Sequence, residues 1–251
     1  FKIYSLVSGS AHLFKPGIYP LSPTFSGIKI ASILVAGPQD IVAVIQEGET
    51  LVDIDRKLAE LKVINSGELI AYNQRQDQSL EGYLFPDTYR FVPFSSAEVI
   101  VKRFLDNFEK KVGKINYRTL ILASLVEKES FHSQDRLLVA GILEKRLKLG
   151  MPLQVDAANV YIKCQGAYVT CSDRERKLSR ADLKIASPYN TYLHQGLPLT
   201  PIANPGQEAI VAVLNPQPSP YLYYISNPKT GRLVFAQTLD EHNENKFKYL
   251  K

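Results

Sequence analysis

A strongly apolar stretch in the middle of the chain, residues 118–130, sets the tightest constraint on the fold. It reads R-T-L-I-L-A-S-L-V-E-K-E-S, which has the length and the apolar content of a buried helix. At about 100° per residue, Leu122, Leu125 and Val126 share one stripe, Glu129 falls in the middle of that stripe, and Glu127 falls on its flank. Charged side chains rarely occupy a buried face unless they are paired or used in chemistry, so the pattern predicts a special role for Glu129.

Two interpretations of Glu129 follow from its position. Loss of hydration would raise the pKa of a carboxylic acid on an apolar face, which is the condition that a general acid needs at neutral pH. Alternatively, Glu129 forms a structural ion pair with an arginine, for example Arg118 or Arg136, or marks the frayed end of the helix. The position of the residue leaves both interpretations open.

Composition limits the class of protein. The chain has 251 residues, 45% of them apolar and 22% charged, which is enough for one large domain or two small ones. Its longest apolar runs fall far short of the roughly 20 residues of a membrane span. Residues 1–93 hold 8 Lys and Arg against 10 Asp and Glu, a net −2, and residues 94–251 hold 22 against 15, a net +7. A basic second part could face an anionic polymer, but no basic run with interleaved aromatics supports binding to nucleic acid.

The two cysteines, Cys164 and Cys171, are separated by six residues. In an oxidising compartment they could close a loop through a disulfide, and reduced thiols fit the sequence equally well. The four histidines are scattered, and none stands at a zinc-ligand spacing from a cysteine. No metal site is therefore expected.

The residue pattern of the first part of the chain predicts a small α+β region. Residues 1–40 are expected to form strands and turns. A β-branched strand at 41–45 and a turn at 47–49 follow, and Thr50 is a suitable N-cap for an amphipathic helix that ends near Gly67. This unit of strand, turn and helix resembles the LysM type of glycan-binding module.

The rest of the chain alternates helices with long loops. Aromatic residues at positions 83, 85, 89 and 91 share one parity, which places them on one face of an extended segment that we interpret as the joint between domains. Helices are expected at 97–112, 136–149 and 207–214, and a hairpin at 221–236. Gln154 and Asp156 share a face of an extended segment. The loops of residues 163–206 carry Tyr, Asn, Thr and Gln side chains that suit sugar hydroxyls and pyranose faces.

Eight motifs in one order make the sequence specific. They are E-G-Y-L-F-P-D-T-Y at 81–89, E-K-E-S at 127–130, R-L-K-L-G-M-P-L-Q-V-D at 146–156, L-S-R-A-D-L at 178–183, S-P-Y-N-T-Y at 187–192, G-L-P-L-T-P-I-A-N-P-G at 196–206, Y-L-Y-Y at 221–224 and E-H-N at 241–243. Together they resemble the MltG-type endolytic murein transglycosylase (YceG-like) family over roughly residues 40–251. Ala157 stands where that family usually has a proline, and the two cysteines lie outside its pattern.

The resemblance implies an α+β fold with two domains. A small LysM-like wall-binding region would occupy residues 1–92, and the sequence leaves open whether its first 40 residues are truncated. A larger α+β catalytic domain with a lysozyme-like active-site helix would occupy residues 93–251. The second glutamate of E-K-E, Glu129, would be catalytic. The candidate residues for binding the sugar are Gln154, Asp156, Tyr189, Asn190, Thr191, Tyr192 and Asn204.

The activity that the family implies is cleavage of the bond between N-acetylmuramic acid and N-acetylglucosamine in nascent peptidoglycan strands. Protonated Glu129 would donate to the glycosidic oxygen, and its carboxylate would then deprotonate the muramoyl 6-hydroxyl, which closes a 1,6-anhydro ring. This reaction needs no metal or organic cofactor. The alternatives are a hydrolytic muramidase that uses Asp156 or Glu127 as a second carboxylate, and a non-catalytic wall-binding scaffold.

The resemblance also carries expectations about partners and location. Peptidoglycan glycan strands and peptidoglycan synthases are the expected partners, and nucleic acid is not. A single N-terminal helix, absent from this fragment, would anchor the protein in the cytoplasmic (inner) membrane. The chain would then lie on the extracytoplasmic or periplasmic side.

Overall fold

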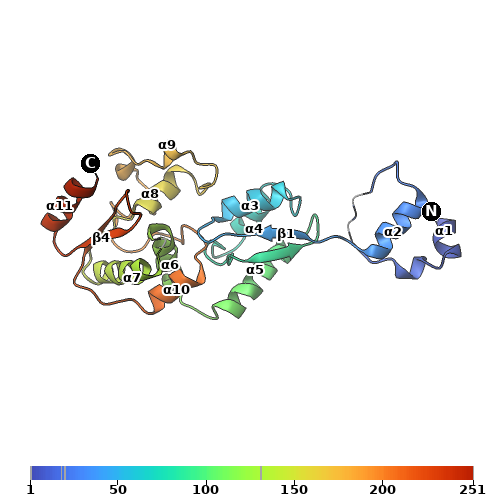
Figure 1. Ribbon diagram of the computed structural model, residues 1–251, viewed down its shortest axis with the longest axis horizontal. Coiled ribbons are helices and arrows are strands. Elements are labelled where there is room, and N and C mark those ends of the chain that lie inside the picture. Colours follow the sequence, from blue (N-terminus) through green and yellow to red (C-terminus); the bar gives the residue numbers. More distant parts are fainter. Residues whose placement is uncertain (1, 18, 20, 131, 251) are drawn as a thin grey trace.

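The computed structural model describes residues 2–17, 19, 21–130 and 132–250, which form three parts in an elongated arrangement (Figure 1). A pair of N-terminal helices lies at one end, and a small unit built on strands β1 and β2 lies in the middle. A larger, mainly helical unit lies at the other end, where the C-terminus also lies. Among the described residues, no helix is both long enough and apolar enough to cross a membrane.

The prediction of strands and turns for residues 1–40 is wrong, because the described part of this region is largely helical. Its elements are α1 (Lys2–Val7), the 3-10 helix η1 (Ala11–Leu13) and α2 (Gly27–Ala36). The β-branched residues of α2 favour a strand, but its ends are capped as a helix. The Ser26 hydroxyl accepts a hydrogen bond from the N–H of Lys29 at 3.2 Å, and the N–H of Gly37 donates to the carbonyl of Ile33. Residues 1, 18 and 20 of this prediction lie outside the described residues.

The middle unit is a two-stranded antiparallel sheet with helices packed on one face. Its elements are β1 (Ile41–Val44), α3 (Leu51–Glu60), α4 (Glu68–Gln74), β2 (Thr88–Phe91) and α5 (Ala97–Lys111). Ala43 of β1 lies opposite Tyr89 of β2, and both are buried with Phe91 against the helices. Val42 and Val44 lie on the other face of the sheet and are exposed.

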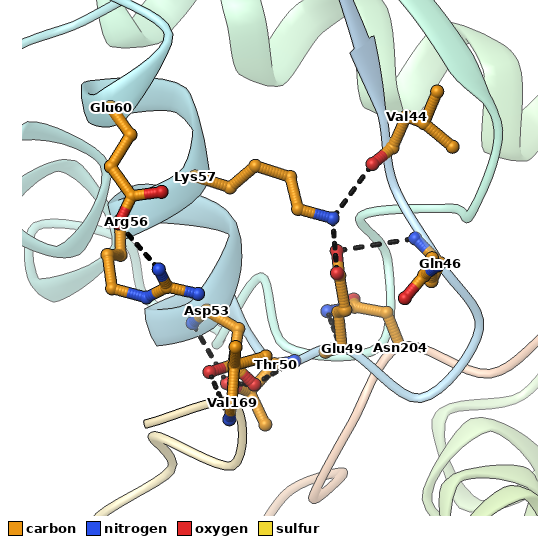
Figure 2. Close-up of polar contacts among 10 residues, drawn as sticks. All are labelled: Val44, Gln46, Glu49, Thr50, Asp53, Arg56, Lys57, Glu60, Val169 and Asn204. Carbon is orange, nitrogen blue, oxygen red and sulfur yellow. Dashed lines mark hydrogen bonds and ion pairs between the residues drawn. The ribbon is translucent and has the colours of Figure 1, made fainter. Parts of the chain in front are cut away.

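The turn between β1 and α3 confirms the expected N-cap. The Thr50 hydroxyl accepts a hydrogen bond from the N–H of Asp53 at 3.1 Å, and the Asp53 carboxylate accepts one from the N–H of Thr50 at 3.4 Å. This capping box satisfies two donors that the first turn of a helix otherwise leaves unpaired. The side chains of this turn are drawn in Figure 2.

The four aromatic residues of segment 83–91 do not share one strand face, contrary to the prediction. Tyr89 and Phe91 pack in the core of the middle unit, whereas Phe85 is buried in the core of the larger unit with Tyr83 against it. The strand begins only at Thr88, after a turn through Gly82, whose φ of +92° is unfavourable for other residues. The two aromatic pairs therefore serve two different cores.

The larger unit is built around helix α6. Its elements are α6 (Tyr117–Glu129), α7 (Ser133–Lys148), α8 (Asp156–Lys163), α9 (Asp173–Arg176), the 3-10 helix η2 (Asp182–Lys184), α10 (Gln207–Leu214), β3 (Tyr223–Ser226), β4 (Leu233–Ala236) and α11 (Leu239–Tyr249). The side chains from Leu120 to Glu127 are all buried, because α6 packs against α7, α8 and α10. The expected helix at 207–214 and the expected hairpin are confirmed.

The amide side chain of Asn204 is one of the contacts that join the middle and larger units. The Nδ2 atom of Asn204 donates to the Glu49 carbonyl at 2.9 Å and to a Glu81 carboxyl oxygen at 3.0 Å, and its Oδ1 accepts from the N–H groups of Gly82 and Leu84. Asn204 is fully buried, and both donors and both acceptor positions of its amide are used within the protein.

The core of the middle unit extends beyond β2 into α5. Ile100, Val101 and Phe104 are buried with the side chains of the sheet, whereas Phe108, one turn further along α5, is buried in the core of the larger unit. Helix α5 thus contributes to both cores. The domain boundary at residue 92 stays a prediction.

Candidate active site

Glu129 is the last residue of α6, and its largely buried side chain lies where α6, α8 and β3 meet. The Tyr224 hydroxyl of β3 and the N–H of Ala157 in the first turn of α8 both donate hydrogen bonds to it. Burial raises the pKa of Glu129 to about 7, and the negative charge of Asp156 acts in the same direction. The two hydrogen bonds and the positive charge of Arg146 oppose this rise. The rise that the sequence predicts is therefore present.

Arg146 holds together the two segments that contact Glu129. Its side chain is buried in α7 and donates to the carbonyl of Leu222, just before β3, at 2.7 Å. It also donates to the carbonyl of Leu153, just before α8, at 2.7 Å, and the ring of Tyr223 lies 5.1 Å from its guanidinium carbon. One guanidinium group therefore fixes both the strand and the helix from which the partners of Glu129 project.

Gln154 and Asp156 are both exposed, Gln154 on the segment that leads into α8 and Asp156 at the first position of that helix. Gln154 has a φ of +52°, a conformation that is uncommon for a residue other than glycine and that recurs at functional sites. Its N–H donates to the carbonyl of Thr191 at 3.0 Å, which holds the strained turn in place. The Tyr192 hydroxyl donates to the carboxylate of Asp156.

The loop of residues 187–192 contributes side chains of two kinds. Asn190 and Thr191 are buried: the Asn190 amide donates to the carbonyls of Leu183 and Ile185, and the Thr191 hydroxyl accepts from the N–H of Val155. These contacts shape the loop. Tyr189 and Tyr192 are partly exposed, and the Tyr189 hydroxyl lies 2.9 Å from that of Thr200.

The seven predicted sugar-binding residues thus fall into three groups. Gln154, Asp156 and Tyr192 lie together and are at least partly exposed, and Tyr189 is partly exposed elsewhere on the same loop. Asn190 and Thr191 hold the backbone of that loop. Asn204 lies in the joint between the units, where its amide has no free hydrogen-bonding position.

Glu127, the other carboxyl of the motif, is held in a separate ion-pair network. Its carboxylate lies 2.9 Å from the guanidinium of Arg136 and accepts the N–H of Gly206 at 3.0 Å. Burial raises the pKa of Glu127, and Arg136 opposes the rise. The structural ion pair considered for Glu129 is therefore made by Glu127, while Arg118 lies 3.9 Å from Glu144.

Sequence reasoning missed three contributors to the site: Tyr224, Arg146 and the N–H of Ala157. Two of them lie within motifs that were noted for other reasons, Tyr224 in Y-L-Y-Y and Arg146 at the start of R-L-K-L-G. A buried arginine and a tyrosine at a fixed motif position were the available signals. The group that a backbone N–H faces depends on the fold and cannot be read from the sequence.

Cys164 and Cys171 form a disulfide, which decides between the two states that the sequence left open. Across the part of the chain that the structure describes, no three or more His, Cys, Asp and Glu side chains are grouped in a way that could hold a metal ion.

Comparison with known proteins identifies the family of this chain. Residues 1–248 match the YceG-like family. The chain is 38% identical over 190 residues to the endolytic murein transglycosylase of Bacillus subtilis (strain 168), covering 71% of this chain and 50% of that protein. It is 32% identical over 178 residues to the protein of the same name from Streptococcus pneumoniae (strain ATCC BAA-255 / R6), covering 66% of this chain and 31% of that protein.

A solved structure agrees with this match. The crystal structure of a YceG-like protein from Listeria monocytogenes superposes with a TM-score of 0.66 at 30% sequence identity, covering 96% of this chain and 88% of that one. The mixture of helices and two small sheets in the described part of this chain fits the α+β class expected from the sequence. The chain spans about half the length of its Bacillus relative and about a third of its Streptococcus relative. The chain belongs to the YceG-like family.

Proposed function

We propose that this chain is the catalytic part of an endolytic lytic transglycosylase that cleaves peptidoglycan glycan strands. The observation that carries the proposal is the position of Glu129, a carboxyl whose pKa is raised to about 7 by burial and which lies near the exposed Asp156. An acid with such a pKa can give up and regain a proton near neutral pH. The names of the Bacillus and Streptococcus relatives support the same activity.

The proposed reaction uses one carboxyl twice. Protonated Glu129 donates its proton to the oxygen between N-acetylmuramic acid and N-acetylglucosamine, and the bond from that oxygen to the muramoyl C1 breaks. The Glu129 carboxylate then accepts the proton of the muramoyl 6-hydroxyl, whose oxygen bonds to C1 and closes the 1,6-anhydro ring. Water is not consumed, and Glu129 ends in its starting protonation state.

The surrounding residues have separate proposed roles. Gln154, Asp156, Tyr189 and Tyr192 contact the sugar, because their side chains are at least partly exposed near Glu129 or on the adjoining loop. Three buried side chains act indirectly by holding loops in place, those of Asn190, Thr191 and Asn204. Tyr224 and the N–H of Ala157 orient the carboxyl and stabilise its ionised form.

The test is digestion of purified glycan strands by the chain and by Glu129→Gln, followed by mass spectrometry of the products. The wild type should release fragments with 1,6-anhydro ends, and Glu129→Gln should lose activity by at least about a hundredfold, because a general acid contributes roughly that much or more. Glu98→Gln, at an exposed position of α5, is the matched control and should stay active. A Glu129→Gln variant with unchanged effects would favour a non-catalytic wall-binding scaffold.

A hydrolytic muramidase is the second candidate, because the charge of Asp156 acts directly on Glu129 and a hydrolase needs a second carboxylate. Glu127 is the weaker choice for that role, since Arg136 and Gly206 already occupy its carboxylate. The same digestion separates the two reactions. Hydrolysed ends carry one water more than anhydro ends.

The proposal extends to the middle unit and to location. We regard the middle unit as LysM-like and wall-binding, supported by its two-stranded sheet with α3 and α4 on one face. We place the chain on the extracytoplasmic side of the cytoplasmic membrane, carried there by a single membrane anchor and acting with peptidoglycan synthases. The Cys164–Cys171 disulfide supports this location, because disulfides persist in oxidising compartments.

A further inference from the structure

A short loop closed by a disulfide lies between α8 and α9. Cys164 follows the last residue of α8, and Cys171 precedes the capping serine of α9, seven positions later. The two cysteines and Val160 form a small apolar cluster, against which Tyr168 packs. The disulfide therefore holds the two ends of the loop together, and Tyr168 packs against the cluster that the two cysteines form with Val160.

One side of this loop contacts the middle unit. The Thr50 hydroxyl donates to the carbonyl of Gly166. The N–H of Val169 donates to the Asp53 carboxylate at 3.0 Å, a contact drawn in Figure 2. Gly166 has a φ of +79°, and a Cβ there would lie 3.3 Å from Val52. The first turn of α3 thus bonds the loop at two points.

The other side contacts the neighbours of Glu129. The Tyr168 hydroxyl donates to the carbonyl of Ala157 at 2.6 Å, and the N–H of that same residue donates to the Glu129 carboxyl. The Nζ atom of Lys128, the residue before Glu129, lies 3.7 Å from the centre of the Tyr168 ring. That Nζ also donates to the carbonyl of Gly48 in the middle unit.

We propose that Tyr168 is a positioning residue for Glu129, and that the Cys164–Cys171 disulfide and the first turn of α3 hold Tyr168 in place. The inference rests on the proposed function, because it assigns a task to the surroundings of the proposed acid. It adds that the docking of the middle unit is transmitted to the catalytic carboxyl, along a path from Thr50 and Asp53 through the loop to Ala157. No contact between the middle unit and Glu129 itself is required.

The chemical consequence follows from the groups that face Glu129. They are Tyr224 from β3, Asp156 and the N–H of Ala157 from α8, Arg146 from α7, Tyr192 from the loop of residues 187–192, and Tyr168 itself. The N–H of Ala157 stabilises the ionised carboxylate. If Tyr168 releases Ala157, that hydrogen bond weakens and the carboxyl holds its proton to higher pH.

The experiment measures the pH dependence of kcat/KM on purified glycan strands for four proteins besides the wild type. Tyr168→Phe keeps the ring over Lys128 and removes only the hydroxyl. Cys164→Ala/Cys171→Ala opens the loop. Ala157→Pro removes the N–H donor itself, at a first-turn position of α8 where proline is tolerated. Tyr4→Phe, in the distant helix α1, is the control.

The expected result is an ordered set of shifts. The alkaline limb should move to higher pH by about one unit in Ala157→Pro, by about half a unit in Tyr168→Phe and in the double cysteine variant, and not at all in Tyr4→Phe. Because the chain holds only 2 cysteines, a thiol reductant acts on this disulfide alone and should reproduce the profile of the double variant.

Two outcomes separate this inference from the proposed function. If the wild type makes no anhydro products, the proposed function fails. The inference is overturned if the wild type is active and Tyr168→Phe lowers kcat/KM by the same factor at every pH. It is also overturned if Tyr168→Phe lowers only the melting temperature, because the hydroxyl then has a merely structural role. Should the double cysteine variant not fold, Tyr168→Phe and the reductant still decide the matter.

Discussion

Groups from different elements shift the pKa of Glu129 in opposite directions. Burial and the charge of Asp156 favour the protonated form, whereas Tyr224, the N–H of Ala157 and Arg146 favour the ionised form. The resulting pKa of about 7 lets one residue act as acid and then as base. Each neighbour can be removed separately, so the sign of each influence is open to measurement.

Activity should fall as the pH rises through about 7, because the acid must carry its proton before cleavage. Tyr224→Phe removes a donor to the carboxylate and should move this limb to higher pH. Asp156→Asn removes a negative neighbour and should move the limb to lower pH, each shift being on the order of half a unit to one unit. The pH profile of kcat/KM checks both. Shifts of the same sign in the two variants would contradict this account.

At the scale of elements, helix α6 shows why a helical wheel could not rank the two glutamates. The wheel assumes one apolar face and one solvent face, but α6 is surrounded by α7, α8 and α10 and is buried on all sides. Glu127 is consequently buried, and Arg136, nine residues further along the chain, together with the N–H of Gly206 makes its burial tolerable.

The capping box of α3 has a measurable contribution to stability. Thr50→Ala should lower the free energy of unfolding by about 1–2 kcal/mol, because it removes the cap of the first turn and leaves the Gly166 carbonyl without its donor. Thr50→Ser keeps the hydroxyl and should lose much less. Urea denaturation of both variants provides the measurement, and equal losses would show that the methyl group matters rather than the cap.

Local patterns predicted most elements of the fold but not the contacts between distant segments. The N-cap at Thr50, helix α10 and the β3–β4 hairpin follow from signals within a few residues. The prediction for residues 1–40 was wrong because the β-branched residues favour a strand there, whereas the capping residues favour a helix. The partners of Glu129 come from α8 and β3, far along the chain, and only folding brings them together.

At the scale of the whole molecule, the joint between the middle and larger units contains a second buried acid. Glu81 accepts the N–H of Leu51 at 3.0 Å and an amide hydrogen of Asn204, and burial raises its pKa from 4.5 to about 8. The folded protein therefore keeps this proton at neutral pH, whereas the unfolded chain releases it. The stability of the joint is thereby linked to pH.

The free energy of unfolding should fall as the pH rises from about 4.5 to about 8, because the unfolded chain binds fewer protons than the folded one in this window. Glu81→Gln removes this proton and should give a flatter profile. Urea denaturation at pH 5 and pH 8 measures the difference, with Glu98→Gln as a control. Parallel profiles for the wild type and Glu81→Gln would contradict the assignment.

The Asn204 side chain makes four hydrogen bonds to two stretches of chain, at Glu49 and at residues 81–84, that are distant from it in sequence. Rotating its side chain away would leave buried polar groups on both sides without partners at the same moment. We therefore expect that partial separation of the two units at this point is unfavourable, because it breaks these four hydrogen bonds together.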